Sequence, residues 1–372
     1  MTALRNQHGT ALVAALGIAM ILLPLGALVT LQCRTDLSIQ HNLRSDIESF
    51  YVAEAGLAHA VAEILPGQSF DLILAGPDGI KGTADDGVFP FAEGGGTAAF
   101  PYPPYRYDVQ AVATGSNMLN IISRASGVNG SAKVVETLVM RSPLPFTPAA
   151  LYADTANPNL NLGSSFQLSG LDHQAVFPPV AQPQPSAALP AISTPRPDAE
   201  LALRNELSGT ASGQITGAGD APSVSTAQQL DLDTYAKSVA STPTAAVHAA
   251  GSIDNATWGT TGAPQLSIVA GDLQVTGRLT GCGVLIVKGA LQVAGTVEFA
   301  GVVLVQGAAL FEPASSVTVV GTLWQAASQD ERLELRGSGI IAYSSDALSD
   351  LDRAFPGLLP HAVAVTGWRE DL

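Results

Sequence analysis

The side chains best placed to bind a metal ion gather in one glycine-rich stretch. The segment GPDGIKGTADDG carries Asp78, Asp85 and Asp86, and calcium takes six to eight oxygen ligands of this carboxylate type. The segment lacks the acidic alternation of an EF-hand loop, so a solvated turn is the other interpretation. Calcium at these three residues is the one cofactor that we consider.

Other chemistry finds little support in the sequence. The six histidines are scattered, without the spacing of a metal site. Neither a serine-nucleophile elbow nor a phosphate-binding loop is present. We therefore expect no catalytic residues and no enzymatic activity.

The composition restricts the possible partners and the fold. The net charge is −15, which argues against bulk electrostatic binding to nucleic acid, because such binding needs Lys and Arg to displace counterions. The 372 residues suffice for two or three domains, and the 37 glycines and 24 prolines favour many turns and short strands. The two cysteines, Cys33 and Cys282, lie too far apart in the expected layout to form a disulfide.

The elements that would carry any site begin with an uncharged N-terminal segment. The 24 residues from Thr10 to Cys33 contain no charged side chain, and as a helix they span about 36 Å, more than a hydrocarbon core of roughly 30 Å. Arg5 precedes the segment, whereas Arg34 and Asp36 follow it and nearly cancel. A retained membrane helix is predicted, with the N-terminus in the cytoplasm. A cleaved signal and a lipoprotein signal ending at Cys33 are the alternatives.

An amphipathic stretch continues this helix. Its apolar residues fall on one narrow stripe at helical spacing: Ile39, Leu43, Ile47, Phe50, Leu57, Val61 and Ile64. Pro66 and Gly67 supply the stop, so one helix from about Thr10 to Leu65 is predicted, its stripe covered by a β domain. Glu54 falls inside the apolar arc, either as an exposed helical side chain or as a buried carboxylate with a partner.

These first 65 residues carry a resemblance. The block NQHGTALVAALGIAMILLPLGALVTL, followed by FYVAEAGLAHA over residues 50–60, resembles the N-terminal region of PilX-type minor pilins of type IV pili. The resemblance implies a leader peptide over residues 1–9, cut by a prepilin peptidase between Gly9 and Thr10. It also implies that the stripe and Glu54 form an assembly helix. The chain departs from major pilins in having Thr10 instead of Phe and Ala14 instead of Glu, which fits a filament-tip or initiating role.

The middle of the chain contains two different kinds of segment. Three alternating segments, Tyr105–Ala113, Met118–Ala125 and Lys133–Met140, predict an antiparallel meander packed on the helix. The segment 144–245 is rich in proline and is interpreted as an irregular connection. It contains one short helix, Thr226–Ser241, capped by Ser225 or Thr226.

The C-terminal part repeats. Gly271, Gly289 and Gly307 stand 18 residues apart, as do Ile268, Ile286 and Leu304. A fixed period of β-branched runs broken by glycine indicates a solenoid, and 18 residues at about 3.3 Å each form a coil of three short strands. We expect a parallel β-helix with Ile268, Ile286 and Leu304 in one inward column and Lys288 facing outward.

The end of the chain is predicted to cap the last coil, through a helix over 345–355 and a strand over His361–Gly367. β-helix enzymes need polar groups stacked across coils. The corresponding positions here are Asp272, Ala290 and Ala308, which do not form such a stack.

The sequence thus predicts an α+β chain. Its expected parts are a leader (1–9), a pilin-like helix with a transmembrane half (10–65), a β meander (66–143), a connecting region (144–245) and a capped parallel β-helix (246–372). The resemblance implies a minor pilin for pilus initiation, tip display and adhesion. Its expected partners are major and minor pilins, the assembly machinery, the prepilin peptidase and the inner membrane. Its expected location is the inner membrane and the cell surface. A type II secretion pseudopilin and a membrane-tethered β-helix adhesin are the alternatives.

Overall fold

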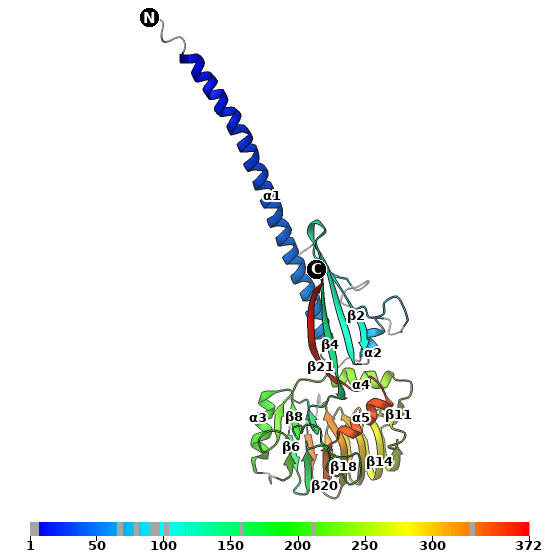
Figure 1. Cartoon of the computed structure of the whole chain (residues 1–372). Helices are drawn as coiled ribbons and strands as arrows, with labels where there is room; N and C mark the ends of the chain where they lie inside the picture. Colours follow the sequence, from blue (N-terminus) through cyan, green and yellow to red (C-terminus); the bar gives the residue numbers. More distant parts are fainter. Residues whose placement is uncertain are drawn as a thin grey trace.

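The computed structural model describes residues 7–64, 70–77, 82–89, 97–99, 104–115, 117–155, 159–209, 213–326 and 332–371. It has the predicted fold class. A long helix leads to a small antiparallel sheet, and a parallel β-solenoid lies at the end of the molecule opposite the N-terminus (Figure 1).

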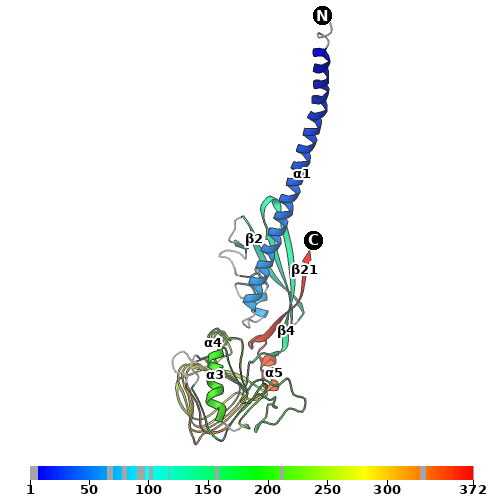
Figure 2. The ribbon, with the colours of Figure 1, turned by 90° about the vertical axis from the view of Figure 1, so that its left-hand side faces the viewer.

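The helix α1 (Gln7–Ile64) is continuous through 58 residues, as predicted from its joined apolar and amphipathic halves. At 1.5 Å per residue it is about 90 Å long. Its N-terminal half stands clear of the rest of the chain, whereas its C-terminal half lies along the sheet (Figures 1 and 2).

The sheet beside α1 has the strand order β1-β2-β3-β4-β21. The three predicted strands are confirmed as β2 (Arg106–Gly115), β3 (Met118–Ser126) and β4 (Ala132–Pro145), which pair antiparallel in sequence order. The short β1 (Thr97–Ala99) lies beside β2, and α2 (Phe70–Leu74) contacts the same strand. The alternating side chains turn one face toward α1, with Val109, Ile121 and Val135 buried.

The last strand does not lie where the sequence predicted it. Strand β21 (His361–Asp371) does not cap the solenoid but pairs antiparallel with β4, with His361 opposite Pro145 and Trp368 opposite Thr137. The solenoid body, residues 146–360, is therefore inserted between two neighbouring strands of the sheet. The predicted division at 246–372 is wrong in this respect, because the final strand belongs with the meander.

The 18-residue repeat is confirmed by the register of the stacked strands. These strands are β11 (Ala246–His248), β12 (Gly251–Trp258), β13 (Gln265–Val269), β14 (Leu273–Val287), β15 (Leu291–Val293), β16 (Thr296–Val305), β17 (Ala309–Phe311), β18 (Ser316–Gln325), β19 (Arg332–Leu335) and β20 (Ser338–Tyr343). Ile268 pairs with Ile286, and Ile286 with Leu304, in parallel ladders.

A stack of three glycines turns three successive coils at the same point. Gly283, Gly301 and Gly321 are neighbours in register, and their φ angles of 141°, 126° and 139° are ones that side chains with a Cβ rarely adopt. These three glycines thus mark a corner of the solenoid.

The segment 144–245 is not the irregular connection that its prolines suggested. It supplies further parallel strands: β5 (Leu151–Ala153), β6 (Asn159–Leu162), β7 (Phe166–Ser169), β8 (Ile192–Thr194), β9 (Ile215–Thr216) and β10 (Val224–Thr226). Strands β5, β6 and β7 stack on β18, β19 and β20, and β8 and β10 follow. These earlier segments cover the edge of the last repeated coil, the role that had been assigned to the C-terminal strand.

Among the described residues, three α-helices lie against the solenoid. Helix α5 (Ser345–Ala354) agrees with the prediction, and α3 (Pro197–Glu206) was not predicted. Helix α4 (Leu232–Ser241) begins later than expected, because Asp231 and not Ser225 or Thr226 is its N-cap, accepting a hydrogen bond from the Thr234 amide.

The predicted column of Ile268, Ile286 and Leu304 is buried, but it does not face inward. Next in register are Trp324 and Tyr152. The Trp324 ring lies 5.2 Å from that of Tyr235 on α4, and the Tyr152 hydroxyl accepts a hydrogen bond from the Leu230 amide. The column therefore lies under α4, on the outer side of the strands. Lys288 is exposed, as predicted.

Candidate functional site on the long helix

The first half of α1 has the properties of a membrane-spanning segment. Within the described residues there is one helix long and apolar enough to cross a membrane. Its large side chains are exposed on every side, with Leu12, Met20 and Leu23 each 67% exposed or more. Cys33 is exposed and Cys282 buried, and both thiols are free.

The predicted cleavage pair, Gly9 and Thr10, lies in the first turns of α1. The side chains of residues 7–11 are outside the described set. Cleavage at this peptide bond stays a prediction.

The second half of α1 presents one face to the sheet. The residues on this face are small and buried: Ser45, Ser49, Ala53, Gly56 and Ala60. A Cβ atom on Gly56 would lie 2.4 Å from the Ser123 Oγ and 2.8 Å from the Tyr107 ring. The helix and sheet thus approach so closely that only small side chains fit between them. We call these five residues the covered face.

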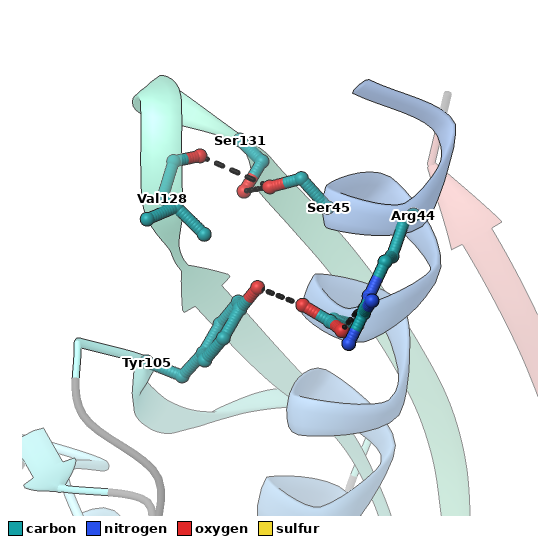
Figure 3. Close-up of polar contacts among 6 residues, drawn as sticks. Arg44, Ser45, Tyr105, Val128 and Ser131 are labelled. Carbon is teal, nitrogen blue, oxygen red and sulfur yellow. Dashed lines mark hydrogen bonds and ion pairs between the residues drawn. The ribbon is translucent and has the colours of Figure 1, made fainter. Parts of the chain in front are cut away.

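Polar contacts stabilise this packing at the N-terminal end of the covered face, around Ser45 (Figure 3). The Ser45 hydroxyl donates to the Val128 carbonyl at 3.0 Å and lies 2.9 Å from the Ser131 hydroxyl. One turn on, the Tyr105 hydroxyl donates to the Glu48 carboxylate, which also accepts from Arg44 Nε at 2.8 Å.

The Tyr105–Glu48 contact shifts the acidity of both groups. The hydrogen bond from Tyr105, followed by that from Arg44, lowers the pKa of Glu48. The same bond to Glu48, with some burial, raises the pKa of Tyr105. Glu48 therefore favours its charged form and Tyr105 its protonated form, the pair of states that holds the helix on the sheet.

The predicted apolar stripe is only partly covered by the sheet. Leu57 and Ile64 are buried, and Phe50, Glu54 and Val61 are half-buried. Ile39, Leu43 and Ile47 are instead 59%, 60% and 48% exposed, which corrects the expectation that the β domain would cover them. The covered face lies about 100° round the helix from the stripe, at 100° per residue.

Tyr51, which is 61% exposed, adjoins Ile47. We call Ile39, Leu43, Ile47 and Tyr51 the open face. The sequence did carry a signal for the covered face, in the small residues at positions 45, 49, 53, 56 and 60, which recur at helical spacing. The prediction relied instead on the larger apolar side chains of the stripe.

The C-terminal strand borders the open face. The Phe50 ring meets the Trp368 ring of β21 edge-on, with centroids 5.8 Å apart, and Trp368 is 53% exposed. A shallow groove between helix and sheet is lined by Leu43, Asp46, Ile47, Phe50, Tyr51, Lys133 and Glu370. Lys133 and Glu370 form an ion pair at 3.1 Å on its rim.

The candidate calcium residues are only partly described, since Asp78 lies outside the described residues. The Asp86 carboxylate accepts a hydrogen bond from the Gly82 amide at 2.8 Å, and the Asp85 carboxylate accepts one from the Thr83 hydroxyl at 2.6 Å. Throughout the described part of the chain, three or more His, Cys, Asp or Glu side chains do not come together as a metal site. Calcium binding here stays a prediction.

No known protein family matches the chain, and no curated protein matches it. Among solved structures, the competence-associated pilin ComZ from Thermus thermophilus aligns with 88% of this chain and 97% of its own, at 12% sequence identity and a TM-score of 0.23. A score this low does not support a shared fold, so functional inference depends on the residues of α1 themselves.

Proposed function

We propose that this protein is a pilin-like subunit, a minor pilin that enters a type IV pilus through α1 and carries the solenoid outside the cytoplasm. The observation that supports this most is the open face. Ile39, Leu43 and Ile47 continue the uncharged Thr10–Cys33 segment along the same helix, yet the chain's own sheet leaves them exposed.

An exposed apolar face of this kind favours a protein partner. The open face begins where the membrane-spanning half ends, so the bilayer core cannot cover it while the first half remains inserted. Apolar side chains at helical spacing are covered efficiently by another helix. Further pilin subunits supply such helices, and so we propose major and minor pilins as the partners.

The remaining parts of the proposal follow from this role. The helix anchors the protein in the inner membrane with its N-terminus in the cytoplasm, and the prepilin peptidase cuts between Gly9 and Thr10 before the assembly machinery takes the subunit up. Ala14 stands where major pilins have Glu, which favours a position at the tip or in initiation. We also propose that the body acts by binding, as in adhesion, and not by catalysis.

The test compares the open face with a distant apolar side chain. The full-length variant carrying Leu43→Asp and Ile47→Asp should remain folded, because both positions are exposed, but should be lost from sheared filaments. Leu201→Asp on α3, where the leucine is 62% exposed, should be incorporated normally. Incorporation of the double variant at the wild-type level would refute the role of the open face. Absence of the wild-type protein from filaments would favour a tethered surface protein.

A second variant separates assembly from display. Because the body is inserted between β4 and β21, residues 146–360 can be replaced by a short turn that keeps both strands of the sheet. This variant should still join filaments and should lose any surface or cell contact that the full-length protein provides. A truncation after β4 is less suitable, because it also removes β21 from the sheet.

A further inference from the structure

The neck between the sheet and the solenoid consists of two crossings of the chain. Strand β4 leads out of the sheet and β21 leads back, and the Phe146 amide donates to the Pro360 carbonyl at 2.6 Å between them. Helix α5 lies beside this crossing (Figure 2) and contacts both β4 and the solenoid strands β16 and β18. Any movement of the body relative to the sheet must change contacts here.

One buried side chain joins three elements at the neck. His361, the first residue of β21, is 5% exposed. Its Nδ1 atom lies 2.8 Å from the Ser142 carbonyl oxygen on β4, and its Nε2 atom lies 2.9 Å from the Asp352 carboxylate on α5.

The two contacts depend on the protonation of the ring. A backbone carbonyl and a carboxylate both accept hydrogen bonds, so both contacts are hydrogen bonds only when each ring nitrogen of His361 carries a proton, as in the imidazolium form. A neutral ring that keeps its bond to Ser142 turns a nitrogen lone pair toward the Asp352 carboxylate, and the two repel each other. The Asp352 side chain is 21% exposed and can then turn to water.

The other charged groups on these elements are engaged elsewhere. On α5, Asp350 and Arg353 pair with each other at 2.8 Å. On β4, the Arg141 guanidinium donates to Asn117 Oδ1 at 3.1 Å. Among the described residues of α5 and β4, Asp352 is thus the charged group in contact with the ring.

We propose that the His361–Asp352 contact is a proton-operated latch between the solenoid and the sheet. The latch is closed while the ring carries both protons, and α5 then holds the body against β4. Loss of the second proton opens the latch and frees the body to move about the neck. This inference is independent of whether the chain assembles into filaments.

The test uses the full chain in detergent at about pH 5.5 and about pH 8.5, on either side of the range in which histidine ordinarily titrates. Nitrogen NMR of the histidine rings, assigned with His361→Gln, should show both His361 nitrogens protonated at the lower pH and one at the higher. Exchange of the Phe146 amide, corrected for its intrinsic pH dependence, should be about tenfold faster at the higher pH, the effect of losing one charged hydrogen bond.

The matched variant is Asp352→Asn. Its amide can donate to the neutral ring, so the latch stays closed without the charge and the pH dependence of Phe146 exchange should disappear. Asp350→Asn, on the same helix, should keep the wild-type dependence. Exchange that does not change with pH in the wild type, or that changes equally in Asp352→Asn, would overturn the proposal. A His361 ring that stays neutral at the lower pH would also overturn it.

Discussion

Apolar residues at regular spacing are buried in the solenoid, whereas some of those on the long helix remain exposed. In the solenoid, Ile286 and Leu304 repeat every 18 residues and are fully buried by the chain's own strands and helices. In α1, Leu43 and Ile47 recur at helical spacing and remain 60% and 48% exposed. Periodicity thus predicts that a surface will be covered, but it does not say which chain will cover it.

The covered face of α1 sharpens this contrast. The sheet packs most closely on Ser49, Ala53 and Gly56, which are small, and leaves the larger Leu43 and Ile47 exposed. Close approach of the backbone matters more at this contact than apolar size. The larger side chains are left available for another molecule.

The largest effect is expected where the chain covers itself. Ile286→Asp should place a charge without a partner under α4 and cost several kcal/mol of folding free energy. Lys288→Asp, two residues on at an exposed position, should cost less than about 0.5 kcal/mol. Denaturant unfolding of both full-length variants measures the difference, and equal losses would contradict the register of the strands.

A smaller loss is expected at the covered face. Gly56→Val should push α1 away from Ser123 and Tyr107 and cost about 1–3 kcal/mol, as overpacking usually does. Gly17→Val makes the same change where no atom beyond the neighbouring residues and backbone of the helix itself lies within 4 Å, and it should leave the stability of the sheet unchanged. Thermal unfolding in detergent compares the two variants. A harmless Gly56→Val would show that the contact is looser than described.

The Tyr105–Glu48 contact should give a smaller, pH-dependent effect. The pKa of Glu48 is lowered from its ordinary 4.5, so its contribution is present above that pH and is lost as the pH falls through the folded-state value. Tyr105→Phe should weaken the contact between α1 and the sheet at neutral pH and make this contact less sensitive to acid. Protease susceptibility of the chain around Tyr105, followed between about pH 3 and about pH 7, is the measurement. Identical acid profiles for wild type and variant would argue against the contact.

The smallest effect is expected on the open face. Ile47→Ser should change the unfolding free energy of the detergent-solubilised chain by no more than about 1 kcal/mol, because about half of the side chain is already exposed. Ile286→Ser, the same chemical change in the solenoid, should cost several times more. Comparable losses in denaturant unfolding would mean that the chain itself covers Ile47.

Local patterns predicted much of the fold. The continuous helix, the three meander strands and the 18-residue coil follow from spacing within short windows. The pairing of β21 with β4 does not, since Trp368 and Thr137 lie more than 200 positions apart and an alternating strand does not specify its neighbour. Strands β5 and β8 are three residues long, too short to show a period among the prolines around them.

The candidate site was predicted in part. The stripe residues were identified correctly as apolar and in line, and Leu57 and Ile64 are buried as expected. The contribution of Trp368 was missed, because it depends on a strand that returns to the sheet after the whole solenoid. The latch at His361 was missed for the same reason, since Ser142 and Asp352 meet the ring only in the folded neck.

The measurement that tests the central claim most directly is thiol labelling at the open face. Ile47→Cys, in a Cys33→Ser background that leaves only the buried Cys282, should react readily with a maleimide in the membrane-anchored protein. In intact filaments the same thiol should be protected, whereas Leu201→Cys on the solenoid should react equally in both states. Protection of Ile47→Cys in filaments is the result that the account predicts. Equal labelling of Ile47→Cys in membranes and in filaments would contradict it.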